Sequence, residues 1–149
     1  MVDSLPVSDM VAVYRAALGG AFTLSDPTLS IVVDPQLLPR TGGLAGGDTL
    51  APAVIAAMRA SGLVQGLCKI PLKASGVPLT CNAERAGYVA RFSQPFGMPG
   101  DTVQVNLVVQ QYSIAGGRPE QRLRFERAYV VVREGATWRA VREARLSAP

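Results

Sequence analysis

The chain has 149 residues, of which 48% are hydrophobic and 17% charged, with a formal net charge of +4. This composition excludes a disordered chain, because disorder goes with low hydrophobicity and high net charge. The sequence contains no histidine, which excludes Ser-His-Asp and Cys-His catalysis, histidine metal sites and histidine pH switches.

Two helices and one short strand are expected in the N-terminal half. Apolar residues at helical spacing predict a first helix over residues 9–18, and a second helix is expected from 48 or 49 to 61. Pro52 falls in the first turn of the second helix, and Gly62 follows its end. Between the helices, residues 29–33 predict a strand, followed by a loop rich in proline and glycine.

From residue 87 onward, alternation of apolar and polar residues predicts four strands. They are separated by the turn sequences GMPGD, AGGRPE and EGA, and we expect them at Tyr88–Ser93, Thr102–Gln111, Arg122–Val132 and Trp138–Leu146. Successive hairpins predict an antiparallel meander, to which residues 29–33 could add a fifth strand. With both helices on one face of this sheet, the fold class is α+β. No repeat or linker divides residues 1–149, so a single domain is expected.

Charge and hydropathy limit the partners and the location. Most basic residues lie after residue 67, but they alternate with glutamates and the chain is only 6% aromatic, so no nucleic-acid partner is expected. No stretch approaches the ~18 apolar residues of a membrane helix, so no membrane insertion is expected. Asp3, Asp9 and Arg15 do not fit a signal peptide. The chain is therefore expected to be a mature exported or periplasmic domain, or otherwise cytoplasmic.

Cys68 and Cys81 flank the sequence KIPLKASGVPLT, which contains prolines and a glycine and could turn back on itself. A disulfide closing a loop of about fourteen residues would contribute roughly 3 kcal/mol and would imply an oxidising compartment. The alternative is two unrelated reduced thiols. Two cysteines at this spacing do not make a zinc site, and no metal or other cofactor is expected.

Strand parity indicates a candidate ligand site. Arg127 and Arg142 fall in the same phase as the apolar residues expected to form the core face, such as Val105. If the Glu134–Thr137 turn sets the register, Arg142 lies opposite Tyr129 and diagonal to Arg127. Two guanidinium groups on an apolar face would suit a carboxylate or phosphate. The aromatic residues expected to form the walls of this site are Tyr88, Tyr129 and Trp138.

Two other interpretations of these arginines stay open. A β-bulge would shift the parity and return them to solvent. Alternatively, they could point inward and form structural ion pairs with Asp34 or Glu84. Either of these acids could also project into a pocket, although a turn or capping role suits both.

The closing sequence AYVVVREGATWRAVREARL resembles the last hairpin of nuclear-transport-factor-2-like (cystatin-related) domains. The resemblance covers about 20 residues, and the chain differs from that family in showing two N-terminal helices with a strand between them. It implies a helix-on-sheet fold whose half-open face lines a pocket. The whole chain also resembles uncharacterised exported bacterial proteins with a central cysteine pair, which implies no activity.

Three functions are compatible with these features. The first is a non-enzymatic domain that binds a small anionic ligand or a protein partner, for which the arginines suffice. The second, implied by the resemblance, is a small isomerase or hydrolase, which needs an acid beside Arg127 as base. The third is homodimeric assembly through the outer sheet face, where Val108, Val130 and Val132 would form an apolar patch.

Overall fold

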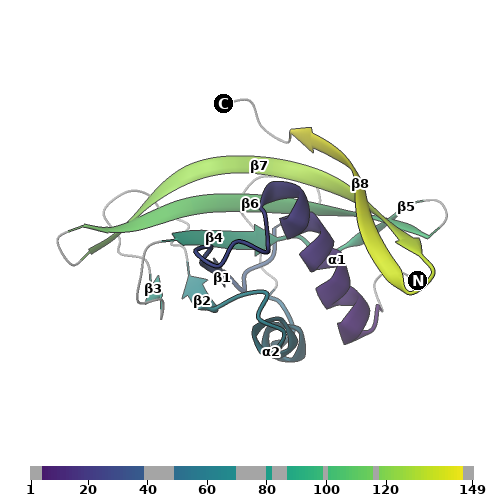
Figure 1. Cartoon of the computed structure of the whole chain (residues 1–149), viewed down its shortest axis with the longest axis horizontal. Helices are drawn as coiled ribbons and strands as arrows, with labels where there is room; N and C mark the ends of the chain where they lie inside the picture. Colours follow the sequence, from purple (N-terminus) through teal and green to yellow (C-terminus); the bar gives the residue numbers. More distant parts are fainter. Residues whose placement is uncertain are drawn as a thin grey trace.

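The computed structural model describes residues 5–38, 49–69, 80–81, 87–98, 101–115 and 118–145. Two helices, α1 (Val7–Ala21) and α2 (Pro52–Ala60), contact each other and lie on the same side of a curved sheet (Figure 1). The α+β class expected from the sequence is therefore confirmed.

The described strands form one sheet in the order β3-β2-β1-β4-β6-β7-β8, with β5 also paired to β6. Their bounds are β1 Ile31–Val33, β2 Gly66–Lys69, β3 Thr80–Cys81, β4 Gly87–Phe92, β5 Phe96–Met98, β6 Thr102–Ala115, β7 Arg118–Glu134 and β8 Thr137–Arg145. The sequence did not predict β2, β3 or β5 as strands, and β6 and β7 extend beyond their predicted bounds into a long hairpin (Figure 1).

The sheet is mixed, and the expectation of an antiparallel meander was wrong for its N-terminal part. Strand β1 pairs in parallel with β2 on one side and with β4 on the other, with Val32 opposite both Gly66 and Val89. A helix joining two neighbouring strands brings the chain back to the same end of the sheet, so β1, α2 and β2 form a parallel crossover unit. The antiparallel prediction holds for β4, β6, β7 and β8.

The core lies between α1 and the concave face of the sheet. Helix α1 buries one face, and its central side chain, Tyr14, packs against Phe92 with ring centroids 4.2 Å apart. The Tyr14 hydroxyl donates a hydrogen bond to the Ser93 carbonyl at 3.0 Å. Sheet residues of the predicted phase face the helix and are fully buried, among them Ala90, Phe92, Val105, Leu107, Val109 and Val131. The parity prediction is therefore confirmed for β4, β6 and β7.

The other face of the sheet is also buried at its centre and carries charge. Arg91 is 1% exposed, and its Nε donates a hydrogen bond to the Gln36 carbonyl at 2.9 Å. Burial lowers the pKa of Arg91, and the negative charge of the buried Asp34 raises it. The guanidinium thus holds the segment after β1 against β4. Val108 lies opposite Arg91 and is 1% exposed, so it does not form the surface patch expected for assembly.

Replacing Arg91 with methionine is expected to lower the free energy of unfolding by about 3 kcal/mol. The Gln36 carbonyl loses its donor, and the Asp34 carboxylate loses a neighbouring positive charge in a buried setting. Urea unfolding followed by circular dichroism measures the loss. The control is Arg142→Met, an exposed arginine on the same sheet, which should change stability by no more than about 0.5 kcal/mol. Equal losses in both variants would contradict this role of Arg91.

Candidate functional site

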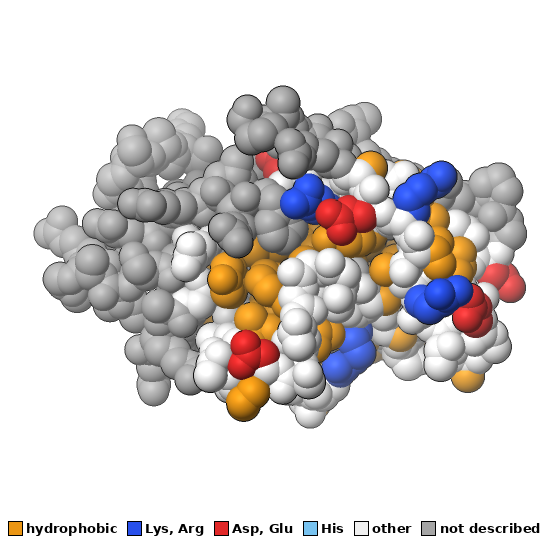
Figure 2. Space-filling model, turned by 45° about the horizontal axis from the view of Figure 1, so that its top comes forward, with side chains coloured by type: hydrophobic (Ala, Val, Ile, Leu, Met, Phe, Trp, Pro, Cys, Tyr) orange, Lys and Arg blue, Asp and Glu red, His pale blue; other side chains and the backbone are white. Residues whose placement is uncertain are grey.

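Arg127 lies on β7 opposite Leu107, in the phase that faces α1. Its Nε is 2.9 Å from Oε1 of Glu143 on β8, and the two side chains are 27% and 43% exposed. Arg127 is therefore ion-paired at the edge of the concave face. The sequence offered Asp34 or Glu84 as partners, but the acid that the structure places there is Glu143. On the side of the molecule drawn in Figure 2, basic side chains lie next to acidic ones at more than one place.

A β-bulge in β8 determines whether Arg142 or Glu143 lies on the same face of the sheet as Arg127. Across β7 and β8, Val131 lies opposite Ala140 and Val130 opposite Arg142, so Val141 is an extra residue in β8. The extra residue shifts the phase of the strand beyond it. As a result, Arg142 pairs with Val130 and is exposed on the other face of the sheet from Tyr129. The residue that pairs with Tyr129 across the two strands is Glu143. The expected pair of arginines is therefore not formed, although the Glu134–Thr137 turn is where the sequence predicted it.

Tyr129 is 1% exposed and packs under the end of α1, so close to Gly20 that a Cβ there would lie 2.7 Å from the Tyr129 ring. Its hydroxyl oxygen is buried and makes no hydrogen bond of acceptable geometry among the described residues. The pKa of Tyr129 is raised to about 12, chiefly by burial; the neighbouring Glu143 carboxylate, through its charge and its polar contact with the hydroxyl, also raises the pKa, and the charge of Arg127 lowers it. The tyrosine is therefore a neutral core residue at physiological pH.

The other aromatic residues expected around the arginines lie far apart. Tyr88 is half-buried and contacts Phe22, just after α1, with ring centroids 4.8 Å apart. Trp138 lies opposite Arg133, which is six positions along β7 from Arg127, or roughly 20 Å. Its indole Nε1 donates a hydrogen bond to Asp9 at the start of α1 at 3.3 Å. Tyr88 and Trp138 thus contact opposite ends of the helix and do not form walls of one site.

The two acids singled out in the sequence do not join Arg127 either. Asp34 is fully buried in the phase of Arg91, and its Oδ1 accepts a hydrogen bond from the Gln36 backbone N–H at 2.9 Å. This is the turn role that its sequence position favours. Glu84 lies outside the described residues.

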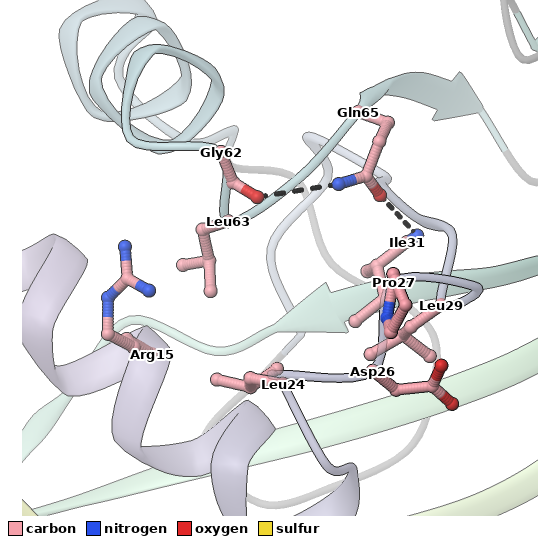
Figure 3. Close-up of a pocket in the computed structure, with 9 residues that line it drawn as sticks. All are labelled: Arg15, Leu24, Asp26, Pro27, Leu29, Ile31, Gly62, Leu63 and Gln65. Atoms are coloured by element: carbon pink, nitrogen blue, oxygen red, sulfur yellow. Dashed lines mark hydrogen bonds between the residues drawn. The ribbon is translucent and has the colours of Figure 1, made fainter.

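A cavity of about 190 Å³ opens beside α1, away from Arg127, between the segment that leads to β1 and the turn after α2 (Figure 3). Its apolar lining comes from Leu24, Leu29, Ile31 and Leu63. Gly62, with φ of 76°, ends α2 in the left-handed conformation expected of a C′ glycine and lets Leu63 turn inward, where it is buried. The cavity is therefore built by the helix end that the sequence predicted.

Two hydrogen bonds fix one wall of this cavity. The Gln65 side chain accepts a hydrogen bond from the Ile31 backbone N–H at 2.6 Å and donates one to the Gly62 carbonyl at 3.4 Å (Figure 3). In addition, the Gln65 backbone N–H donates to the Ile31 carbonyl at 2.7 Å. These hydrogen bonds join the turn after α2 to the start of β1, and they hold Gln65 in place as one wall of the cavity.

Two charged residues, Arg15 and Asp26, line the same cavity. Arg15 is exposed on α1, its guanidinium extends toward Leu63, and no ion pair joins it to an acid within the described residues (Figure 3). The Asp26 carboxylate points away from Arg15 and accepts hydrogen bonds from the Thr28 hydroxyl and N–H at 2.7 and 2.9 Å. These bonds lower the pKa of Asp26. The cavity thus combines apolar side chains with a cation that has no acidic partner among the described residues, and polar atoms form the larger part of its exposed lining.

Sequence reasoning missed this cavity and the role of Glu143. Arg15 is visible in the sequence as a charge that interrupts the apolar run of the first helix, but nothing local shows that a cavity adjoins it. The position of Glu143 beside Arg127 depends on the bulge at Val141, which no glycine or proline marks in the sequence.

Within the described residues, no group of three or more His, Cys, Asp or Glu could hold a metal ion, and no helix is long and apolar enough to cross a membrane. Comparison of the chain with protein-family models, with curated proteins and with solved structures finds no match. The function must therefore be argued from the chain's own geometry.

Replacing Tyr129 with phenylalanine is expected to leave the free energy of unfolding unchanged or to raise it by up to about 1 kcal/mol, because a buried hydroxyl without a hydrogen bond is removed. Tyr14→Phe is the matched control: it removes the donor to the Ser93 carbonyl and should cost about 1–2 kcal/mol. Urea unfolding of both variants compares the two hydroxyls. A loss at Tyr129→Phe as large as that at Tyr14→Phe would show that the Tyr129 hydroxyl is satisfied.

The alkaline limit of stability is expected to depend on Tyr129. Its pKa is about 12 in the folded protein and about 10 when unfolded. The unfolded state therefore loses this proton first, and the contribution to stability is complete below about pH 10 and is lost as the pH rises toward 12. Thermal unfolding of the wild type and Tyr129→Phe across this window should show a shallower decline in the variant. Parallel curves would contradict the raised pKa.

Proposed function

We propose that the domain binds a small organic monocarboxylate in the cavity beside α1, without catalysing a reaction. One observation carries the proposal: Arg15, a cation without an acidic partner among the described residues, borders a cavity that apolar side chains line in part. A guanidinium binds a carboxylate through two parallel hydrogen bonds, and apolar side chains such as Leu24 and Leu29 would contact the hydrocarbon part of such a ligand.

The size of the cavity limits the ligand. A volume of about 190 Å³ equals the share of roughly six molecules of liquid water, which suits an acid with a short chain or a single ring. Nucleotides and larger cofactors are too big. Asp26, at the other side of the cavity, adds a negative charge that favours monoanions over dianions.

Arg127 is less suited to this function, because a ligand would have to displace Glu143 from a 2.9 Å ion pair. That pair does support a second candidate, the small isomerase or hydrolase, since an acid stands beside Arg127. The charge of Glu143 is balanced by Arg127, which weakens a carboxylate as a base. The assembly alternative has lost Val108, which is buried, and keeps only the half-buried Val130 and Val132.

We also propose that the fold is nuclear-transport-factor-2-like (cystatin-related). Its support is a long helix across the concave face of a curved sheet whose strands β4, β6, β7 and β8 are antiparallel, with the hairpin of β7 and β8 last in the sheet (Figure 1). The parallel unit of β1, α2 and β2 is the part in which the chain differs from that family, because it places a strand between the two N-terminal helices.

The proposal predicts that benzoate binds and that its neutral analogue benzamide does not. A titration followed by backbone amide NMR signals should give saturable shifts at Leu24, Leu29, Leu63 and Gln65, with a Kd on the order of 1 mM. Arg15→Gln is expected to weaken binding about 10- to 100-fold, because a charge-assisted hydrogen-bonded pair is worth about 1.5–3 kcal/mol.

Arg59→Gln is the matched control, since Arg59 is an exposed arginine on α2 that lines only a shallow neighbouring hollow. This variant should bind benzoate as the wild type does. Equal binding of benzoate and benzamide, or equal effects of the two arginine substitutions, would overturn the proposal. Shifts centred on Arg127 and Glu143 would instead favour the second candidate.

A further inference from the structure

The two cysteines of the chain meet at the edge of the sheet. Strands β2 and β3 pair antiparallel, with Cys68 directly opposite Cys81 and Lys69 opposite Thr80. The cysteine pair is therefore one of the two register pairs that join these strands. The sequence showed only that the chain between the cysteines could turn back, whereas the register places them side by side.

Directly opposed residues of an antiparallel pair have their Cα atoms about 4.5 or 5.5 Å apart, depending on the hydrogen-bonding phase. Disulfides span Cα separations of roughly 4.4–6.8 Å. Residues opposite each other also share one face of the sheet. The backbone register therefore meets the requirement of a disulfide in either phase, without movement of the strands.

We propose that Cys68 and Cys81 form a disulfide that clamps the edge hairpin of β2 and β3. A small-molecule disulfide such as glutathione disulfide is the oxidant. One cysteine thiolate attacks a glutathione sulfur and releases a glutathione thiol, and the second thiolate then attacks the mixed disulfide and releases another. The protein loses two electrons and two protons, and one glutathione disulfide becomes two glutathione thiols.

In this fold, the disulfide would stabilise the edge of the sheet. Strand β3 has only two residues, and such a short pairing contributes few hydrogen bonds to hold the edge of the sheet. Its partner β2 pairs in parallel with β1 and begins directly after Gln65, whose side chain accepts a hydrogen bond from the Ile31 backbone N–H. A crosslink between β2 and β3 fixes the outer side of the parallel unit. It also supports the exported or periplasmic location proposed for the chain, because disulfides persist in oxidising compartments.

The test uses the full chain after equilibration in a mixture of reduced and oxidised glutathione. The protein is unfolded in denaturant, so that buried thiols also react, and is then treated with iodoacetamide and trypsin. The expected result is no alkylated cysteine and a linked pair of peptides, Ala60–Lys69 with Ala74–Arg85, from protein that runs as a monomer without reductant. Alkylation of both cysteines, or a link between two chains, would overturn the proposal.

Thermal unfolding provides an independent measurement. Reductant should lower the Tm of the wild type by roughly 6–12 °C, as expected for a loop of about fourteen residues in a domain of this size. The matched control, the double variant Cys68→Ser and Cys81→Ser, should melt at the temperature of the reduced wild type and should not respond to reductant. A wild-type Tm that is the same with and without reductant would contradict the clamp.

Discussion

Helix α1 holds the curved sheet and fixes the position of both regions considered for function. Six of its residues are buried, and each end of the helix is anchored separately to the sheet. Asp9 accepts a hydrogen bond from Trp138 at one end, and Gly20 packs on the Tyr129 ring at the other. A helix of fifteen residues spans about 22 Å, so both contacts are met only in one orientation. That orientation places Arg15 beside the turn after α2.

The sequence predicted both helices, the strand before the second helix and the core phase of β4, β6 and β7, because these features depend on local periodicity. It did not predict the charge facing Arg127, which depends on one extra residue. Val141 fits a regular strand as well as a bulge by its side-chain type. The choice is made by packing of the whole strand, and it exchanges Arg142 for Glu143 on the concave face. Parity arguments are therefore safe only up to the first bulge.

The parallel pairing of β1 could not be predicted from the sequence for a related reason. The prediction of a strand at residues 29–33 and a helix after it was correct, but which strands would flank β1 is a long-range choice. That choice explains Asp34 and Arg91, which look like surface residues in the sequence and lie buried beside β1 and on β4. A buried arginine is tolerated here because backbone carbonyls of Gln36 and Leu37 accept from it. Burial of charge thus follows from topology.

The surroundings of each arginine, and not the number of arginines in the chain, determine which of them can bind an anionic ligand. An arginine that already pairs with a carboxylate must give up that partner, so the gain from a ligand is only the difference between two similar interactions. This applies to Arg127. An arginine on an open surface, such as Arg142, keeps its water, and a carboxylate there is screened and weakly held. Arg15 differs from both, because it has no acidic partner among the described residues and borders a cavity that apolar side chains line in part. We therefore expect a carboxylate to gain more from Arg15 than from Arg127 or Arg142.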